Sequence, residues 1–334
     1  MRRTAELRKS FAALLLISSC LNAWAQPAVD AHLAAAKKAE GTDFPGTIAR
    51  LCIVPDAPVG GGTGGAGSLR PIPDRASWYA EPARMYDNLY WVGTKIHSAW
   101  ALQTSGGIIL IDTLFNYAIE PEIVDGLKKL GLNPATIKYV IITHAHGDHD
   151  EGAKLLQDRY GSHVVMGAPD WELIEKNPNM PGGVPKRDII AEDGQKITLG
   201  NDSVTLITTP GHTLGTLSMI FTVKDHGKPL TIAYSGGTAF NFPKDTARYE
   251  TYIASQKKMA DAAKAAGATV IMSNHSEFDD AWNRSRLVRL HHAGEPHPYD
   301  VGAEAVQRYF TMTGECAEAM RARLDSELMA CLRE

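Results

Sequence analysis

Residues 143–149 read Thr-His-Ala-His-Gly-Asp-His, so three imidazoles and a carboxylate fall within six positions. They follow a mainly apolar, β-branched run that predicts a buried strand. Alternate side chains at a strand end point to one side, so His144 and His146 can reach one ion while Asp148 and His149 face a neighbouring position. Imidazole and carboxylate groups are ligands of zinc. A solvated polar loop is the weaker interpretation, because such crowded titratable groups would repel or neutralise one another without an ion.

Two further histidines follow predicted strands in the same way. His212 comes after the strand 204–209 and a Pro-Gly pair that exposes it, and His275 comes after the strand 269–272. A lone histidine is more often a surface or core residue, but the repeated placement at strand ends favours ligands here. The other histidines lack this context and are interpreted as structural, with His97 the one most worth attention: His32, His97, His163, His226, His291, His292 and His297.

Short β-rich runs precede an alternation of strands and helices. Strands are predicted at 89–92, 99–103, 107–112, 137–143, 163–167, 204–209, 218–223, 230–234 and 269–272. Helices are predicted at 120–130, 152–160, 170–176, 249–266 and 301–332, the last interrupted near Gly314. This order indicates a layered α/β protein with covered sheets. No internal repeat is evident.

The first 25 residues have the pattern of a secretory signal peptide. Four basic residues precede the apolar run 11–18, and Ala23-Trp24-Ala25 supplies a cleavage site. Cleavage there is preferred over a lipoprotein site, which would leave a lipid on Cys20. No stretch offers the roughly 18 uninterrupted apolar residues of a membrane span. The mature protein is therefore expected to be periplasmic or secreted.

Residues 26–77 are predicted to form an irregular arm, and residues 78–334 a single catalytic domain. The arm contains the glycine-rich run 60–65, with prolines on both sides. A phosphate-binding loop would follow a strand and open a helix, whereas this run is followed by Pro71 and Pro73.

Charge argues against a nucleic-acid partner. Residues 1–25 carry four basic residues and one acidic residue, so their removal lowers the formal charge from −4 to −7. A basic surface is not indicated. A small-molecule substrate is the expected partner, and the sequence leaves the oligomeric state open.

Three cysteines remain after residue 25: Cys52, Cys316 and Cys331. Export permits a disulfide, and the odd number leaves at least one thiol over. If one helix joins Cys316 to Cys331, a rise of about 1.5 Å per residue separates them too far for a bond. Cys52 with either of them is then the only simple pair, and three buried free thiols are the alternative.

The pattern His-x-His-x-Asp-His, with a later Pro-Gly-His and a final histidine, resembles the metallo-β-lactamase superfamily from about residue 88 to residue 275. The resemblance implies a four-layer αββα sandwich with metals at one edge of its two sheets. It also implies two zinc ions, the first held by His144, His146 and His212, and the second by Asp148, His149 and His275.

One position narrows this resemblance. Glyoxalase-like thioesterases, many lactonases and flavodiiron proteins place a bridging aspartate at a Gly-Asp-Thr turn, where this chain has Gly237 in the sequence Ser-Gly-Gly-Thr. The cysteine ligand of first- and second-subclass β-lactamases is also missing. The site, the export signal and the long arm are therefore most similar to the third subclass, although the serines that such enzymes commonly carry near this turn are not clearly reproduced.

The implied activity is an exported zinc-dependent hydrolase that opens β-lactam rings, an antibiotic-resistance function, by attack of a metal-bound hydroxide on the amide carbonyl. Asp148 would be the catalytic residue, binding the second metal and orienting the hydroxide. One alternative is hydrolysis of another ester, lactone or thioester with little or no β-lactamase activity. Another is a metal-dependent binding protein without turnover.

Substrate contacts are the least determined part of the site. Four polar residues are candidates by position only, and each is interpreted first as structural: Ser235, Thr238, Asn241 and Asn274. The segment 177–188, rich in proline and glycine, is either a loop that covers the site or a passive surface excursion.

Overall fold

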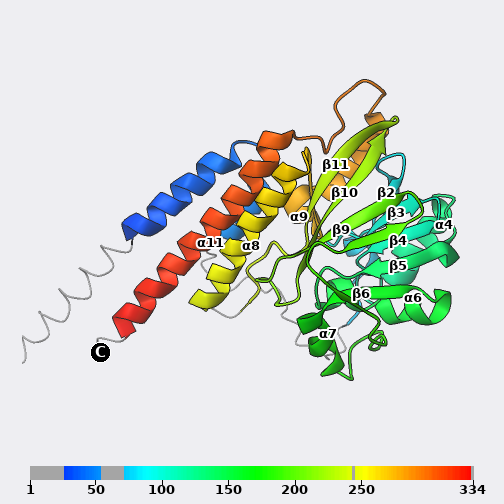
Figure 1. Cartoon of the computed structure of the whole chain (residues 1–334), viewed down its shortest axis with the longest axis horizontal. Coiled ribbons are helices and arrows are strands. Elements are labelled where there is room, and N and C mark those ends of the chain that lie inside the picture. Colours follow the sequence, from blue (N-terminus) through cyan, green and yellow to red (C-terminus); the bar gives the residue numbers. More distant parts are fainter. Residues whose placement is uncertain (1–25, 54–70, 243–244, 332–334) are drawn as a thin grey trace, which may run out of the picture.

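The computed structural model describes residues 26–53, 71–242 and 245–331. Two β-sheets pack face to face, and helices cover the outer face of each, as Figure 1 shows. This confirms the predicted four-layer αββα arrangement. The signal peptide, Cys20 and the glycine-rich run 60–65 lie outside the described residues.

The first sheet has seven strands in the order β1-β2-β3-β4-β5-β6-β7. Their bounds are Ala83–Arg84, Leu89–Trp91, Trp100–Thr104, Gly107–Ile111, Ile137–Ile141, His163–Gly167 and Ile189–Ala191. Strands β1 to β4 pair antiparallel, and β4 to β7 pair parallel. The predicted strands correspond to β2 through β6. Strands β1 and β7 were missed because runs of two and three residues are too short to show a period.

The second sheet has five strands in the order β12-β11-β10-β9-β8. In chain order from β8 to β12 their bounds are Lys196–Leu199, Asp202–Thr208, Leu217–Asp225, Lys228–Ser235 and Val270–Ser273. Only β11 and β12 pair parallel. Sequence patterning predicted β9 to β12 and missed β8. Because β9, β11 and β12 all run in one direction, their carboxyl ends meet at the same edge of the sheet.

Three apolar clusters correspond to the three interfaces between layers. Side chains such as Trp100 from the first sheet and Tyr234 from the second fill the space between the sheets. The outer face of the first sheet packs against α4, α6 and α7, which are Asp125–Lys129, Ala153–Tyr160 and Ala168–Glu175. The outer face of the second packs against α8, Thr246–Ala265, and α11, Ala303–Cys331. Figure 1 shows α8 and α11 side by side on that face.

Apart from the helix at residues 26–40, the remaining helical segments are short. They are α2 at Pro45–Cys52, α3 at Arg75–Trp78, η1 at Ile119–Val124, η2 at Pro134–Thr136, α5 at Gly147–Asp150, α9 at Ser276–Asp279, α10 at Ala281–Leu287 and η3 at Val288–Leu290. The predicted helix 120–130 is thus a π-helical turn, η1, that continues into α4. No helix among the residues described combines the length and the apolar character that a membrane crossing would need.

Two expectations about the helices are wrong. The segment 26–77 is not irregular throughout, because residues 26–40 and α2 are helical and their apolar faces join the cluster beneath α11. The helix α11 is not interrupted at Gly314, which lies in an unbroken span facing Gln256 of α8. The boundary of the catalytic domain at residue 78 stays a prediction.

A disulfide joins α2 to the carboxyl-terminal helix α11. Cys52, at the end of α2, is bonded to Cys316 in α11, across a sequence separation of 264 residues. This is one of the two pairings that the sequence left open. Arg308 of α11 supports the same contact, because its guanidinium donates to the carbonyl oxygens of Ala39 and Glu40 and pairs with Asp43.

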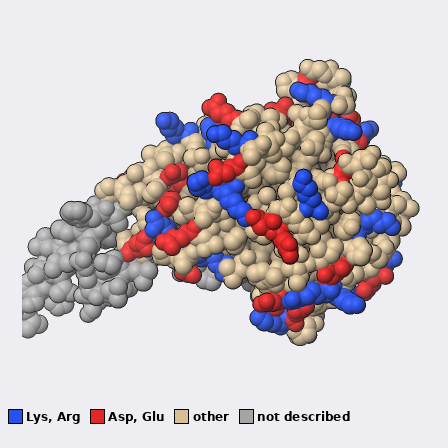
Figure 2. Space-filling model, viewed as in Figure 1, with Lys and Arg blue, Asp and Glu red and all other residues tan. Residues whose placement is uncertain are grey.

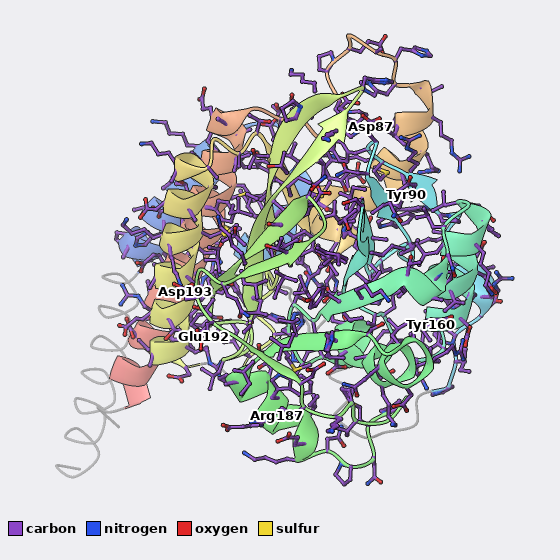
Figure 3. The ribbon with its side chains drawn as sticks, turned by 45° about the vertical axis from the view of Figure 1, so that its right-hand side comes forward. Asp87, Tyr90, Tyr160, Arg187, Glu192 and Asp193 are labelled. Carbon is purple, nitrogen blue, oxygen red and sulfur yellow. A yellow bond between two sulfur atoms is a disulfide. The ribbon has the colours of Figure 1, made fainter. Side chains whose placement is uncertain are left out.

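Both charge signs are mixed on the face of the molecule that Figure 2 shows. Many of the charges are paired, as in Lys258 of α8, whose Nζ lies 2.6 Å from Asp193. Asp193, labelled in Figure 3, lies on the loop before β8 and thereby ties the five-stranded sheet to its covering helix.

Candidate metal centre

Three imidazoles from two loops form a first cluster. His144 and His146 follow β5, and His212 lies in the loop between β9 and β10. The Nε2 atom of His212 lies 3.0 Å from His144 Nε2 and 3.0 Å from His146 Nδ1. Neighbouring ligands of a tetrahedral zinc ion, each about 2.0–2.1 Å from the metal, are about 3.3 Å apart. The three nitrogens therefore have a spacing close to that needed to share one ion.

Backbone carbonyls fix the protons of two of these rings. His144 Nδ1 lies 2.9 Å from the carbonyl oxygen of Gly236, and His212 Nδ1 lies 2.6 Å from that of Ala239. A carbonyl only accepts, so each Nδ1 donates and each Nε2 directs a lone pair into the cluster. Burial, reinforced by neighbouring imidazoles, lowers the pKa of His212 to about 3 and holds that of His144 well below its usual value. Converging lone pairs of this kind favour a cation between them.

A second cluster adjoins the first. Asp148 and His149 lie in α5, and His275 follows β12. Asp148 Oδ2 lies 3.3 Å from Nε2 of both His149 and His275, and those two nitrogens are 3.1 Å apart. Burial acts to raise the pKa of Asp148, but the charge of His149 and the hydrogen bonds of both imidazoles hold it well below its usual value. The ring centroids of His144 and His149 are 4.3 Å apart, so two ions would be neighbours.

Asp112, which the sequence did not single out, orients the second cluster. It follows β4 and accepts from Thr143 N at 2.8 Å and Thr143 Oγ1 at 2.9 Å. Its Oδ2 lies 2.9 Å from His149 Nδ1, which places the Nδ1 proton there and turns Nε2 toward Asp148. Burial acts to lower the pKa of His149, but Asp148 and Asp112 outweigh it and raise the pKa to about 10. A positive charge is therefore favoured at Nε2, where a metal ion can replace the proton.

Asp170 of α7 joins the loops that carry the two clusters. Its Oδ2 accepts from Ala145 N at 2.8 Å and from Thr213 Oγ1 at 2.7 Å, and its Oδ1 accepts from Gly215 N at 3.0 Å. Burial raises the pKa of Asp170 despite these hydrogen bonds. The side chain links the turn at 143–149 to the loop around His212, and nothing local in the sequence marked it.

Most of the polar residues proposed to touch substrate are engaged inside the protein. Ser235 Oγ lies 3.0 Å from Thr238 Oγ1, and both side chains are buried. Asn274 Nδ2 donates to the carbonyl oxygen of Gly236 at 2.7 Å, beside the ring of His144. These contacts agree with the structural interpretation of the three side chains. Asn241 is exposed.

Gly237, where a Gly-Asp-Thr turn would carry its bridging aspartate, has no room for a side chain. A Cβ atom there would lie 2.7 Å from His212 Cβ and 2.9 Å from Thr216 Cγ2. A larger residue would have to displace His212 or the loop that carries it. The local packing is thus consistent with a site built without a bridging carboxylate at this position.

His97 departs from the expectation that it is merely structural. It lies in the loop between β2 and β3, and its Nε2 is 3.4 Å from Asp148 Oδ2. The ligand atoms of His97, Asp148 and His275 all lie within 4.8 Å of one another. The sequence marked His97 for attention but left it with a structural role, whereas the structure places its imidazole beside the second cluster.

Most of the other histidines contact groups outside the two clusters. His32 pairs with Glu315, His163 with Asp188, and His291 with Asp225, and His297 Nε2 lies 2.8 Å from the carbonyl oxygen of Met85. His226 and His291 also lie beside Asp225 as a separate group.

The loop 177–188 packs against the helices that follow the turn at residues 143–149. The backbone N of Lys186 donates to Gln157 Oε1 at 2.7 Å, and Gln157 Nε2 donates back to the carbonyl oxygen of Lys186 at 2.9 Å. Arg187, labelled in Figure 3, forms two hydrogen bonds with Glu175 of α7. These contacts anchor the carboxyl-terminal part of the loop, and the role of the loop over the site stays a prediction.

The donor set fits zinc better than it fits a hard cation. Five imidazoles and a carboxylate were predicted from the sequence, and the structure brings all six side chains together at one edge of the sandwich: His144, His146, His212, Asp148, His149 and His275. Calcium and magnesium prefer oxygen ligands, whereas imidazole nitrogen suits zinc and its transition-metal neighbours.

Comparison with families and curated proteins gives consistent results. The family model of the metallo-beta-lactamase superfamily matches residues 92–227. A hydroxyacylglutathione hydrolase of Acidiphilium cryptum is 28% identical over 123 residues, which are 37% of this chain and 44% of that protein. The hydroxyacylglutathione hydrolase of Brucella ovis is 29% identical over 174 residues, or 47% of this chain and 60% of its own. The chain thus spans less than two thirds of the length of these relatives.

Solved structures match over more of the chain. BJP-1, a subclass B3 metallo-β-lactamase of Bradyrhizobium japonicum, is 27% identical with a TM-score of 0.64, covering 75% of this chain and 98% of its own. A metallo-β-lactamase of Cronobacter sakazakii is 25% identical with a TM-score of 0.61, covering 78% and 99%. FEZ-1 from Legionella gormanii, at 24% identity and a TM-score of 0.61, supports the fold alone.

Proposed function

Because the chain belongs to the metallo-β-lactamase superfamily, we propose that it is a zinc-dependent hydrolase with a two-metal site. His144, His146 and His212 would hold one ion, and Asp148, His149 and His275 the other. The observation that carries this proposal is the convergence of six ligand side chains, with two backbone carbonyls and Asp112 fixing the protons of three rings on their outer nitrogens.

Some residues of the site would bind the metal ions, and others would position the residues that bind them. Zinc supplies a Lewis acid and lowers the pKa of a bound water toward neutrality, so no covalent protein nucleophile is needed. Burial and neighbouring imidazoles lower the pKa of His144 and His212, so these two rings would bind the ion as neutral ligands and leave it most of its positive charge. Asp148 adds a carboxylate to the second position and acts as the catalytic residue there. Asp112 and Asp170 are positioning residues, because they touch ligands or ligand-bearing loops.

We propose a β-lactam as the substrate. Two observations favour it: the likeness to a subclass B3 enzyme over 98% of that enzyme's length, and the packing of Gly237 against His212 that leaves no space for a bridging aspartate. His144, His146 and His212 would hold the ion that polarises the lactam carbonyl, and Asp148, His149 and His275 would hold the ion that stabilises negative charge on the leaving nitrogen.

A second candidate is hydrolysis of a thioester or another ester or lactone. The curated relatives, which match 37% and 47% of this chain, are hydroxyacylglutathione hydrolases. The same pair of metal positions could serve this reaction, so the fold alone does not separate the two substrates.

A substrate panel on purified, zinc-loaded protein tests both candidates. The panel contains a penicillin, a cephalosporin, a carbapenem, an acyl-glutathione thioester and a simple lactone, each followed by absorbance. We expect β-lactam turnover that is lost in His212→Ala and kept in His163→Ala, a remote and half-exposed histidine. Thioester or lactone turnover without β-lactam turnover would reject the first candidate in favour of the second. No turnover of any substrate would reject both.

We also propose that the protein is exported. The disulfide between Cys52 and Cys316 supports this, because such bonds persist in oxidising compartments. Expression in a bacterial host followed by fractionation and N-terminal sequencing tests the idea. A mature chain beginning at Gln26 in the periplasm is expected, a lipid-modified chain beginning at Cys20 would support the alternative site, and an intact cytoplasmic chain would reject export.

A further inference from the structure

We propose that His97 is an additional ligand of the second metal position, acting beside Asp148, His149 and His275. The inference rests on the proposed function only in requiring that a metal ion occupies this cluster. His97 lies in the loop between β2 and β3 of the first sheet, more than forty residues before the His-x-His-x-Asp-His motif.

The first argument is the distance between His97 and Asp148. His97 Nε2 lies 3.4 Å from Asp148 Oδ2, and the same oxygen lies 3.3 Å from Nε2 of His149 and of His275. A hydrogen bond from a ring N–H to a carboxylate is normally about 2.7–2.9 Å long, so 3.4 Å is too long for a good one. Ligands about 2.0–2.2 Å from a tetrahedral zinc ion are about 3.3–3.6 Å apart. All three separations fall in that range.

The second argument is that the backbone places His97 rigidly. His97 and His275 face each other in an antiparallel β-bridge. The bridge is closed by Ser98 N, which donates to the carbonyl oxygen of Asn274 at 2.8 Å, and by Ser276 N, which donates to that of Ile96 at 2.7 Å. The two rings are consequently held with their centroids 5.0 Å apart. The loop is thus tied to the ligand-bearing strand of the other sheet.

The third argument is exposure and packing. The side chains of His97, His275 and Asp148 are 15%, 16% and 18% exposed, so the three form the open side of the cluster, and His149 is fully buried behind them. The ring of Phe115 packs edge-on against His97 with centroids 5.2 Å apart. The imidazole is therefore held in place, as expected for a ligand, at the side where solvent reaches the metal position.

This assignment makes the two metal positions unequal. The first would have three protein ligands, and the second four. Zinc sites with four protein ligands are closed, whereas catalytic sites keep a position open for water or substrate. The geometry therefore assigns the open coordination position to the ion held by His144, His146 and His212. The second ion would act mainly through its charge.

Metal titration of the full chain tests the inference without any activity readout. Metal-free protein is titrated with zinc in competition with a chromophoric chelator, and with Co²⁺ followed by visible absorption. The wild type is expected to bind two ions. His97→Asn, which lacks the Nε2 atom, is expected to lower the affinity for one ion by about 100-fold or more. Even changes to residues that only contact a ligand lower metal affinity by about 10- to 100-fold. The other ion should change by less than about threefold.

Two matched variants and one structure complete the test. His146→Asn should weaken the other ion, and His163→Asn should weaken neither, because it pairs with Asp188 outside the site. Circular dichroism establishes that each variant is folded. A crystal structure of the zinc-loaded wild type needs no variant, and His97 Nε2 is expected about 2.0–2.2 Å from the second ion.

Several outcomes would overturn the inference. They are a wild type that binds a single ion, equal affinities in the wild type and His97→Asn, and a zinc-loaded structure with the His97 ring turned away from the ion. A raised KM with both metal affinities unchanged would also overturn it, by making His97 a substrate-facing group. Failure of the proposed function would look different. The wild type would bind both ions and His97→Asn would bind one of them more weakly, but no substrate in the panel would be hydrolysed.

Discussion

Replacing Asp112 by Asn should lower the metal affinity of the second position and leave that of the first almost unchanged. In the wild type, the side chain of Asp112 is fully buried, and it accepts hydrogen bonds from Thr143 and from His149 Nδ1. Asparagine has the same shape but offers one acceptor and one donor. If its oxygen keeps the Thr143 N–H, its amide N–H₂ faces His149 Nδ1. The ring must then move its proton to Nε2, which is the atom that would bind the metal.

The expected loss is confined to one ion. Removing the carboxylate partner of a metal-bound imidazole weakens metal binding by about 10- to 100-fold, or about 1.4–2.7 kcal/mol. Asp112 contacts His149 directly, whereas His144 and His212 donate to the carbonyl oxygens of Gly236 and Ala239. Asp112→Asn should therefore weaken the second ion by that factor and leave the first almost unchanged.

Competition titration with zinc measures both affinities. Asp193→Asn is the matched control, because that carboxylate is half-exposed and pairs with Lys258 outside both clusters. Equal weakening of both ions in Asp112→Asn would refute the reasoning, because it would mean that Asp112 acts through general stability. Unchanged affinity at both positions would refute the role of the carboxylate in fixing the His149 proton.

Two further predictions concern stability. Burial raises the pKa of Glu122 to about 8, so its stabilising contribution is complete below about pH 4.5 and is lost as the pH rises through 8. In the wild type, the free energy of unfolding should therefore fall by up to about 4 kcal/mol between pH 5 and pH 8 because of Glu122. Glu122→Gln keeps an acceptor for Ala80 N and should remove this part of the fall. Urea unfolding at both pH values measures it, and an unchanged fall in the variant would contradict the prediction. Replacing Cys52 and Cys316 by Ala opens a loop of 264 residues, for which chain entropy gives about 5–6 kcal/mol as an upper value. Guanidinium unfolding should show a loss of several kcal/mol that reductant reproduces in the wild type, and a loss below about 1 kcal/mol would contradict the tethering role.

The proposed ligands that could be identified from the sequence are those that follow a recognisable strand. His144, His212 and His275 each come directly after such a run, and the sandwich brings those strand ends together. His97 could not be found in this way, because it follows no such strand. It is brought to the site by an isolated β-bridge to His275, which lies just after a strand of the other sheet. Asp112 ended a correctly predicted strand, but its role depends on Thr143 and His149, which reach it from the neighbouring strand β5 and the turn after it.

Errors in the helices have a similar origin. The composition of residues 55–73 was extended to the whole segment before residue 77, so the helical residues 26–40 and α2 were overlooked. Gly314 has a poor intrinsic helix propensity, which led to a predicted break. In the structure its position faces α8, and tertiary packing along the α8–α11 interface outweighs the local cost.

The tight fit around Gly237 also bears on how such sites evolve. A bridging aspartate cannot be introduced at residue 237 by one substitution without a local shift, because a Cβ atom there would lie 2.7 Å from Cβ of His212, a proposed metal ligand. The neighbouring loop would first have to shift, and that intermediate would bind its first ion poorly. Glycine is therefore expected at residue 237 wherever the ring of His212 keeps this position.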